Sequence, residues 1–303
     1  MILVTGATGN IGSALLGELH ACGAGPLRGL TRDAARASFP EGVEVSEADF
    51  GDVASLEPAL DGVRSLFLVS RMGPDADVLD AARQADVEHV VLVSSITVRT
   101  HPHLGPAREN LAVERLLKDS GMAWTILRPT QFASNALWWA ASIRRHQTVR
   151  VPYADTGLPT IHPADIAAVA RVALTEPGHQ GRTYALTGPR RVTARQQVGA
   201  IAAALGRDVP CVEIGRDEAH RHMSAFLGAE AADAVLDVTG GDVNDELLRV
   251  RDTVSQVTGS PARSFQQWVA EHVTHFRGSF GHAMASSTEL PPTTGTPSGG
   301  AAG

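Results

Sequence analysis

Three glycines at three-residue spacing follow the first apolar run of the chain, in the sequence Val4-Thr5-Gly6-Ala7-Thr8-Gly9-Asn10-Ile11-Gly12. Gly6 permits a tight turn from strand to helix, Gly9 lets the backbone approach a phosphate, and Gly12 allows close packing of the helix on the sheet. The start of that helix supplies amide donors and the positive end of a dipole. We therefore predict a dinucleotide site formed by Gly6, Thr8, Gly9, Asn10, Ile11 and Gly12. The alternative is a connecting turn that holds no ligand.

The end of the second predicted strand bears on which dinucleotide binds. A site for NAD places Asp or Glu there to hold the ribose hydroxyls, whereas this chain reads Leu30-Thr31-Arg32-Asp33. A guanidinium pairs with a phosphate through two charge-assisted hydrogen bonds, so Arg32 favours the 2′-phosphate of NADP(H). In the alternative interpretation Arg32 is solvated and Asp33 holds the ribose.

The elements that must position these residues alternate in a βαβ pattern. Six short apolar or β-branched runs predict strands: Ile2–Thr5, Leu27–Thr31, Val43–Ser46, Arg64–Val69, His89–Val93 and Ala123–Leu127. Apolar residues at helical spacing lie between them, as in Ile11–Leu19 and Leu111–Leu117. This order predicts an α/β fold of the Rossmann type, with a doubly wound parallel sheet and right-handed crossovers.

The regular order loosens after Arg150, which predicts a dinucleotide-binding domain over 1–150 and a smaller C-terminal substrate lobe over 151–278. Some segments of that lobe are expected to return to the sheet. Its predicted elements are a Pro/Gly-rich passage Val151–Pro159, a helix Pro163–Leu174, a strand Thr183–Leu186 and a helix Ala194–Leu205. Residues 279–303 carry so few apolar side chains that we expect a disordered tail.

Composition excludes several classes of protein. The 303 residues include 33 acidic and 26 basic side chains, and the net charge of −7 argues against a general attraction to nucleic acid or anionic lipid. Two basic clusters, Arg144–His146 and Arg190–Arg191, are interpreted as solvated surface, so nucleic acid is not an expected partner. Cys22 and Cys211 lie outside any CxxC spacing and predict neither a disulfide nor a metal site.

The sequence also bears on location and assembly. It shows no apolar run of roughly 18 residues and no signal-peptide pattern, so we expect a cytoplasmic protein without a membrane span. The oligomeric state stays open, with a homodimer as one alternative.

The Gly-x-x-Gly-x-x-Gly spacing, in place of the commoner Gly-x-Gly-x-x-Gly, resembles the short-chain dehydrogenase/reductase superfamily and its atypical members in particular. The resemblance implies that Asp49-Phe50 lies by the adenine and that Val69-Ser70 closes the fourth strand at the same sheet edge. The alternative for the first pair is a turn aspartate followed by a core side chain.

The catalytic pair usual in that superfamily, a tyrosine and a lysine four residues later, is absent. Its two positions correspond to Pro106 and Asn110, and the only tyrosines, Tyr153 and Tyr184, have glycine four residues on. This departure resembles the NmrA-like branch, which includes dinucleotide-sensing regulators and the type 2 NAD(P)H:quinone oxidoreductases. Further segments carry the resemblance over residues 1–275: Gly121–Phe132, Asn135 and His162–Ala167.

The missing tyrosine bears on the substrate. Reduction of a quinone yields a phenolate that is already stabilised, with a pKa of about 10, whereas an isolated ketone without a positioned acid loses about 10²–10⁴ in rate. Quinones, enones and other conjugated carbonyls are therefore favoured. Candidates to polarise the substrate are Ser94 and Ser95, at the carboxyl end of the fifth strand, and Asn110. His101 and His103 are further candidates; the alternatives are a surface Asn110 and solvated histidines.

Arg128-Pro129 ends the sixth strand, and Pro129 directs the following loop toward the predicted nicotinamide position. Trp138 and Trp139 are expected on a helix about 100° apart, so that at most one lines a pocket. Together these features favour an NADPH-dependent reductase of a quinone or conjugated carbonyl. Two alternatives remain: an NADP(H)-sensing regulator without catalysis, and a non-reductive enzyme such as an isomerase, dehydratase or cyclase that retains the dinucleotide.

Overall fold

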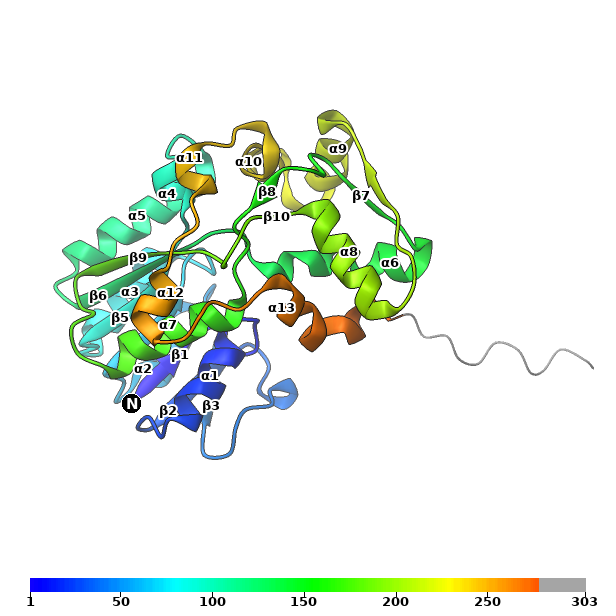
Figure 1. The fold of residues 1–303 in the computed structure, drawn as a ribbon. Coiled ribbons are helices and arrows are strands. Elements are labelled where there is room, and N and C mark those ends of the chain that lie inside the picture. Colours follow the sequence, from blue (N-terminus) through cyan, green and yellow to red (C-terminus); the bar gives the residue numbers. More distant parts are fainter. Residues whose placement is uncertain (278–303) are drawn as a thin grey trace, which may run out of the picture.

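The computed structural model describes residues 1–277, and its central feature is a seven-stranded sheet in the order β3-β2-β1-β4-β5-β6-β9 (Figure 1). Neighbouring strands of this sheet pair in parallel. The strands are β1 (Ile2–Val4), β2 (Leu27–Thr31), β3 (Glu44–Glu47), β4 (Ser65–Val69), β5 (His89–Val93), β6 (Ala123–Pro129) and β9 (Arg182–Leu186). The order reverses between β1 and β4, where doubly wound sheets bind their ligands. The predicted α/β fold of the Rossmann type is confirmed.

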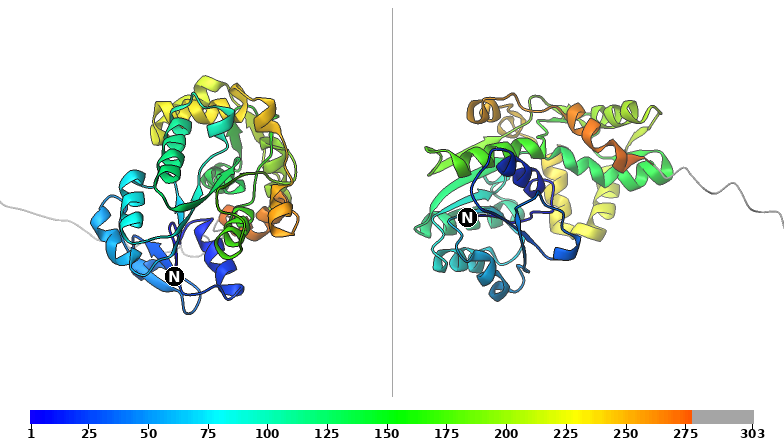
Figure 2. Two further views of the ribbon diagram at one scale, coloured as in Figure 1. Left: turned by 90° about the vertical axis from the view of Figure 1, so that its left-hand side faces the viewer. Right: turned by 90° about the horizontal axis from the view of Figure 1, so that it is seen from below.

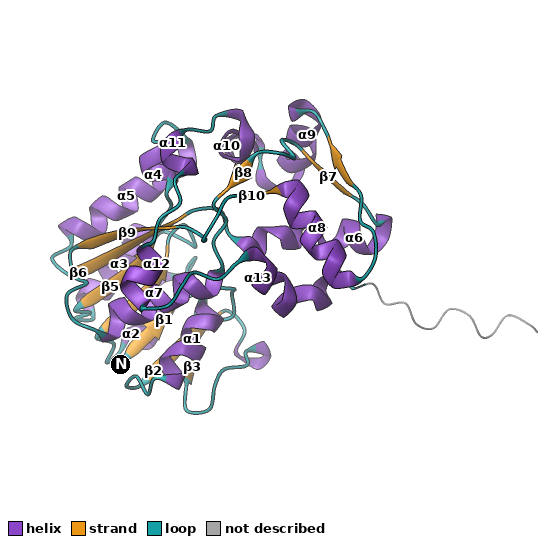
Figure 3. Ribbon diagram, in the orientation of Figure 1, coloured by secondary structure: helices purple, strands orange, loops and turns teal. Residues whose placement is uncertain are grey.

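Side chains alternate along each strand, so the sheet buries a separate apolar core on each face. On β4, Leu66 and Leu68 belong to one core and Phe67 to the other. Figure 3 shows helices on both sides of the strands. The first core is covered by α2 (Glu57–Leu60), α3 (Asp75–Gln84) and α5 (Gly105–Asp119), and the second by α1 (Gly12–Ala21), α7 (Pro163–Thr175) and α12 (Thr253–Thr258).

A third apolar core is built from the segment that follows β6 and from later parts of the chain, around the fully buried Trp268. Its elements are α6 (Ala140–His146), β7 (Val149–Val151), β10 (Val192–Thr193), α8 (Ala194–Leu205), β11 (Cys211–Glu213) and α13 (Phe265–His272). The other elements of this part of the chain, with the short helix after β5, are α4 (Thr97–Thr100), β8 (Gly157–Leu158), α9 (Arg216–Leu227), α10 (Ala229–Leu236) and α11 (Asp245–Leu248). Helix α4 contacts α5 and α11, and α10 contacts α9 and α5. The yellow helices α9 and α10 lie far from the N-terminus in Figures 1 and 2.

The large sheet layer takes elements from beyond residue 150. The strand expected at Thr183–Leu186 is β9, which extends the sheet beside β6, and α7 packs against α1. The division into lobes at residue 150 stays a prediction, and the expected tail over 279–303 lies outside the described residues. Within residues 1–277, none of the helices combines the length and the apolar character needed to cross a bilayer.

Candidate active site

The glycine turn after β1 is folded so tightly that side chains would not fit. Gly6 has a φ of +58°, in the left-handed region that favours glycine. A Cβ on Gly12 would collide with the carbonyl group of Gly6 and with Ala7, and a Cβ on Gly9 would lie 3.1 Å from the Gly6 carbonyl oxygen. The start of α1 therefore packs directly on the end of β1.

This turn leaves backbone donors available. Helix α1 begins without a side-chain cap, and among residues 1–277 the amides of Asn10 and Ile11 find no acceptor. Thr8, Gly9 and Asn10 are exposed, so an anion can approach them from solvent. Free amides at an uncapped helix start are the donor set that a diphosphate requires. The residues present therefore fit the diphosphate of a dinucleotide.

The strand order β3-β2-β1 places three predicted residues along one edge of the sheet. Arg32 follows β2, is exposed, and forms no ion pair with any described residue. Asp49 follows β3 and is also exposed, with Oδ1 accepting a hydrogen bond of 2.9 Å from the amide of Gly51. Phe50, beside it, is buried in the first apolar core.

Ser70, directly after Val69 at the end of β4, contacts Asn110 on α5. The Ser70 hydroxyl donates to Asn110 Oδ1 at 2.6 Å, and Asn110 Nδ2 donates to the Pro106 carbonyl oxygen at 2.9 Å. Asn110 is only 5% exposed. The amide expected to polarise a substrate is thus held by its neighbours, and its catalytic role stays a prediction.

Ser94 belongs to a buried ionic network. Its hydroxyl donates to Oε1 of Glu114 at 2.6 Å, and Arg128 Nε donates to the same oxygen at 2.8 Å. The Glu114 side chain has no solvent exposure. A hydroxyl that already donates to a carboxylate has no further proton to donate, so the contacts of Ser94 position the end of β5. Ser94 also lines the cavity described next, and its catalytic role stays a prediction.

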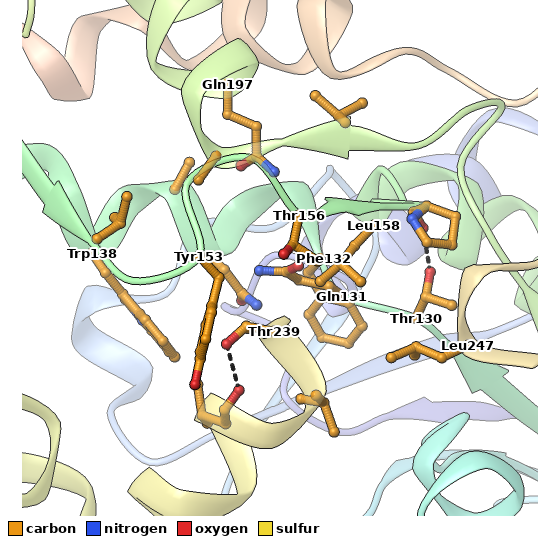
Figure 4. Close-up of a pocket in the computed structure, with 18 of the residues that line it drawn as sticks. Thr130, Gln131, Phe132, Trp138, Tyr153, Thr156, Leu158, Gln197, Thr239 and Leu247 are labelled. Atoms are coloured by element: carbon orange, nitrogen blue, oxygen red, sulfur yellow. Dashed lines mark hydrogen bonds between the residues drawn. The ribbon is translucent and has the colours of Figure 1, made fainter. Parts of the chain in front are cut away.

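Beyond the carboxyl ends of β5 and β6 lies a cavity of about 330 Å³ (Figure 4). Ser95 and Pro129 line it from the sheet edge, and Tyr153, Thr239 and residues of α9 to α11 close its other side. No Asp, Glu, Lys, Arg or His of residues 1–277 lines this space. A concave, apolar site with a few neutral polar groups is the usual environment of a small organic substrate.

Several hydrogen-bond donors line this cavity without an acceptor among the described residues, and Ser95, Gln131 and Asn135 are three of them. The Ser95 hydroxyl accepts from the Thr97 amide (3.2 Å) and the Thr97 hydroxyl (2.8 Å), and its own proton is not engaged. The side-chain amides of Gln131 and Asn135 form no hydrogen bond within residues 1–277. Figure 4 shows the Gln131 amide near Phe132 and Thr156. Both amide residues belong to the segments that carry the family resemblance, Gly121–Phe132 and Asn135, which by themselves indicate no role in substrate binding.

The two tyrosines occupy different environments. Tyr153 lines the cavity from a backbone with a φ of +51°, and its ring packs so closely on Gly240 that a Cβ there would collide with it. Its hydroxyl, together with the Asp237 carboxylate, raises the pKa of Arg216 above the usual value. Tyr184 instead pairs its hydroxyl with His179 Nδ1 at 2.8 Å. The sequence showed that neither tyrosine has the expected lysine, but gave no signal that Tyr153 borders the site.

The two loop histidines also differ in environment. His101 is fully buried, with Nδ1 2.8 Å from the Thr100 hydroxyl and Nε2 bonded to the Asp242 carbonyl oxygen, whereas His103 is exposed. Neither lines the cavity.

Both Trp138 and Trp139 line the cavity, so the expectation that at most one of them does is wrong. The two residues end the 3₁₀ helix Ala133–Trp139, which also contributes Asn135 and Ala136 to the lining, so more than one face of this helix borders the cavity.

The segment His162–Ala167, which carried part of the resemblance, joins the start of α7 to the C-terminal part of the fold. His162 Nδ1 accepts from the Ala164 amide at 3.0 Å, and Nε2 lies 3.2 Å from Glu271 Oε2. Burial lowers the pKa of His162 and raises the pKa of Asp165, although Asp165 accepts two hydrogen bonds from Arg263. These contacts give the segment a structural role in packing α7 against the C-terminal part of the fold.

Comparisons with known proteins agree with this geometry. A family model described as NAD(P)H-binding matches residues 6–177. The chain is 40% identical over 282 residues to the (4-alkanoyl-5-oxo-2,5-dihydrofuran-3-yl)methyl phosphate reductase of Streptomyces griseus, covering 91% of this chain and 99% of that protein. It is 35% identical to the NAD(P)H azoreductase of Xenophilus azovorans, over 91% of this chain and 99% of that one. The crystal structure of the NADPH-dependent quinone oxidoreductase QOR2 from Escherichia coli, complexed with NADPH, has a TM-score of 0.73 at 29% identity and covers 91% of this chain and 99% of its own.

The matches to the three proteins extend over nearly all the described residues and include both the glycine turn and the cavity. The expected cofactor and the resemblance to NmrA-like reductases are confirmed. The chain belongs to the NAD(P)H-binding family, and within the NmrA-like branch it is an NAD(P)H-dependent reductase.

Proposed function

We propose that this protein transfers hydride from NADPH to a quinone or another conjugated carbonyl compound bound in the cavity. The observation that carries the proposal is the lining itself: an uncharged space at the carboxyl ends of β5 and β6 that offers neutral donors and no tyrosine–lysine pair. Such a lining suits an acceptor whose reduced form is stabilised by its own conjugation.

In this proposal the predicted cofactor residues divide the dinucleotide among them. The glycine turn holds the diphosphate, Arg32 pairs with the 2′-phosphate, and Asp49 with Phe50 borders the adenine. Val69, Ser70 and Pro129 contact the part of the dinucleotide that lies nearest the cavity. The free guanidinium of Arg32 supports NADPH over NADH, because it gains a charge-assisted pair only with the phosphorylated ribose.

The bound cofactor supplies a hydride at the nicotinamide ring. The chain's own part is to hold the substrate and to stabilise the negative charge that develops on its carbonyl oxygen. Ser95, Gln131 and Asn135 are the donors for that oxygen, because their hydrogens are not engaged elsewhere in residues 1–277. Water or the Ser95 hydroxyl then delivers a proton to a phenolate or enolate of moderate basicity.

The relatives support this class of acceptor. The name of the Streptomyces protein describes a ring double bond conjugated to two carbonyl groups, and the other names specify azo compounds and quinones. Each of these acceptors takes up hydride at a conjugated position. A small organic substrate is therefore favoured over nucleic acid. A homodimer stays a prediction for analytical ultracentrifugation, and a cytoplasmic location stays one for cell fractionation.

The test is NADPH oxidation in single-turnover mixing with three acceptors of similar size: a naphthoquinone, an acylated butenolide and a saturated ketone. We expect oxidation with the first two and none above background with the ketone. Binding of NADPH without oxidation by any conjugated acceptor would contradict the proposal and indicate a sensor. Product formation without net consumption of NADPH would indicate a non-reductive enzyme.

A further inference from the structure

The lining of the cavity contains no charged side chain among the described residues. Among residues 1–277, none of the side chains that border it is ionisable at neutral pH. Arg216, which lies beside Tyr153, is already engaged: Nη2 is 2.9 Å from Asp233 and Nη1 is 2.9 Å from Asp237. Arg128, beneath the sheet edge, is bound to Glu114. These contacts leave neither guanidinium free to pair with an anionic substrate.

The walls and the opening are mostly apolar. Phe132, Leu158, Val238 and Leu247 border the interior, as Figure 4 shows for three of them. Trp138 also lines the cavity and is 53% exposed, so its ring forms part of the opening. A volume of about 330 Å³ is at the lower end of the range for small-molecule sites, and it suits a bicyclic quinone or a butenolide with a short acyl chain.

A phosphate ester would enter this space at a high energetic cost. Its two negative charges would lose water, and the lining offers no cation in return. Hydroxyls and side-chain amides stabilise the partial charge on a carbonyl oxygen, but they do not replace a counter-ion for a dianion. An alkyl chain gains free energy on the same surfaces, because burying apolar area is favourable.

We infer that the substrate is an uncharged conjugated carbonyl compound with an apolar substituent, and that the cavity selects against its phosphorylated counterpart. The inference rests on the proposed function and specifies its substrate class. It separates this chain from the Streptomyces relative, whose name specifies a methyl phosphate on the ring.

The experiment compares matched pairs that differ by one anionic group: a 4-alkanoyl-3-(hydroxymethyl)butenolide with its phosphate ester, and a naphthoquinone with its sulfonate. Turnover gives kcat/KM, and calorimetry on the enzyme–NADP⁺ complex gives affinity independently of turnover. We expect the neutral member to be favoured about 100-fold or more by both measures. Equal values, or a preference for the charged member, would overturn the inference while leaving the reductase proposal intact. If neither member oxidises NADPH, the proposed function fails, and the calorimetric comparison still decides the question of charge.

A variant tests the cause of the selectivity. Met223 on α9 lines the cavity and is half-buried, so Met223→Lys introduces a cation on a stem of similar length, and Met223→Leu is the matched control. The lysine variant should raise kcat/KM for the phosphate ester about tenfold or more relative to the leucine variant. An unchanged value in a folded lysine variant would contradict the argument from missing charge.

Discussion

Glu114 on α5 and Arg128 near the end of β6 form a buried ion pair in which both carboxylate oxygens accept hydrogen bonds from the guanidinium. Ser94 donates to the same carboxylate. The pair therefore fixes the ends of β5 and β6, from which Ser95 and Pro129 reach the cavity.

Replacing Glu114 by Gln should lower the free energy of unfolding by about 3–5 kcal/mol, because it leaves the largely buried Arg128 without a counter-charge. Urea denaturation measures this effect. Glu109 on the same helix provides the control, since its pair with Arg71 is exposed and Glu109→Gln should cost less than about 1 kcal/mol. Similar losses in the free energy of unfolding in the two variants would show that the buried pair contributes no more to stability than the exposed pair.

Substituting Gly12 by Ala should abolish measurable NADPH binding or prevent folding, because its Cβ would collide with the Gly6 carbonyl group. Gly17 lies in the same helix with open space around its Cβ position, so Gly17→Ala should preserve binding and stabilise the protein by up to about 1 kcal/mol. Fluorescence titration with NADPH and thermal unfolding provide the two readouts. Normal NADPH affinity in Gly12→Ala would contradict the role of the turn.

The Arg32→Ala variant should bind NADPH about 10- to 100-fold more weakly, with little change for NADH, since the guanidinium gains its charged hydrogen bonds only from the 2′-phosphate. Calorimetric titration with both cofactors measures the difference. Arg36→Ala, a few residues away and equally exposed, is the control. Equal losses for the two cofactors would disprove the assignment of Arg32.

Removing the Gln131 amide, in Gln131→Leu, should lower kcat/KM for a quinone about tenfold or more, because a donor to the developing oxyanion is lost, while the Kd for NADPH stays constant. Steady-state kinetics and cofactor titration separate the two effects. Thr239→Val removes a hydroxyl that also lines the cavity but is bonded to the Val235 carbonyl oxygen, and it should have a smaller effect.

Burial lowers the pKa of His89 below 6.5, so the unfolded chain takes up a proton at a pH where the folded protein does not. The stability contributed by neutral His89 is therefore present above pH 6.5 and is lost as the pH falls toward the folded-state pKa. His162 contributes with the same sign. Urea denaturation between about pH 8 and about pH 5 should show a shallower loss of stability in His89→Gln than in the original protein. Identical pH dependence in both would refute this account.

The parts of the site that the sequence predicted depend on local chain geometry. The turn from Gly6 to Gly12 follows from a strand, three glycines and a helix that are contiguous in sequence, and Arg32 and Asp49 follow from the strand ends. The parallel sheet itself was predictable because its strands recur as apolar runs at regular intervals.

The parts that could not be predicted depend on partners distant in sequence. Ser94 is engaged by a carboxylate 20 residues away, and Asn110 by a hydroxyl 40 residues away. Tyr153 lines the cavity from a backbone with a positive φ, a conformation that a non-glycine residue rarely adopts. No residue-type pattern along the chain records such long-range contacts.

The position of β9 at the edge of the sheet has a consequence for biosynthesis. A nascent chain that has emerged from the ribosome only as far as β6 exposes the unpaired backbone groups of that strand, because its remaining neighbour is more than fifty residues away in sequence. The seven-stranded sheet is therefore complete only after Leu186 has been synthesised.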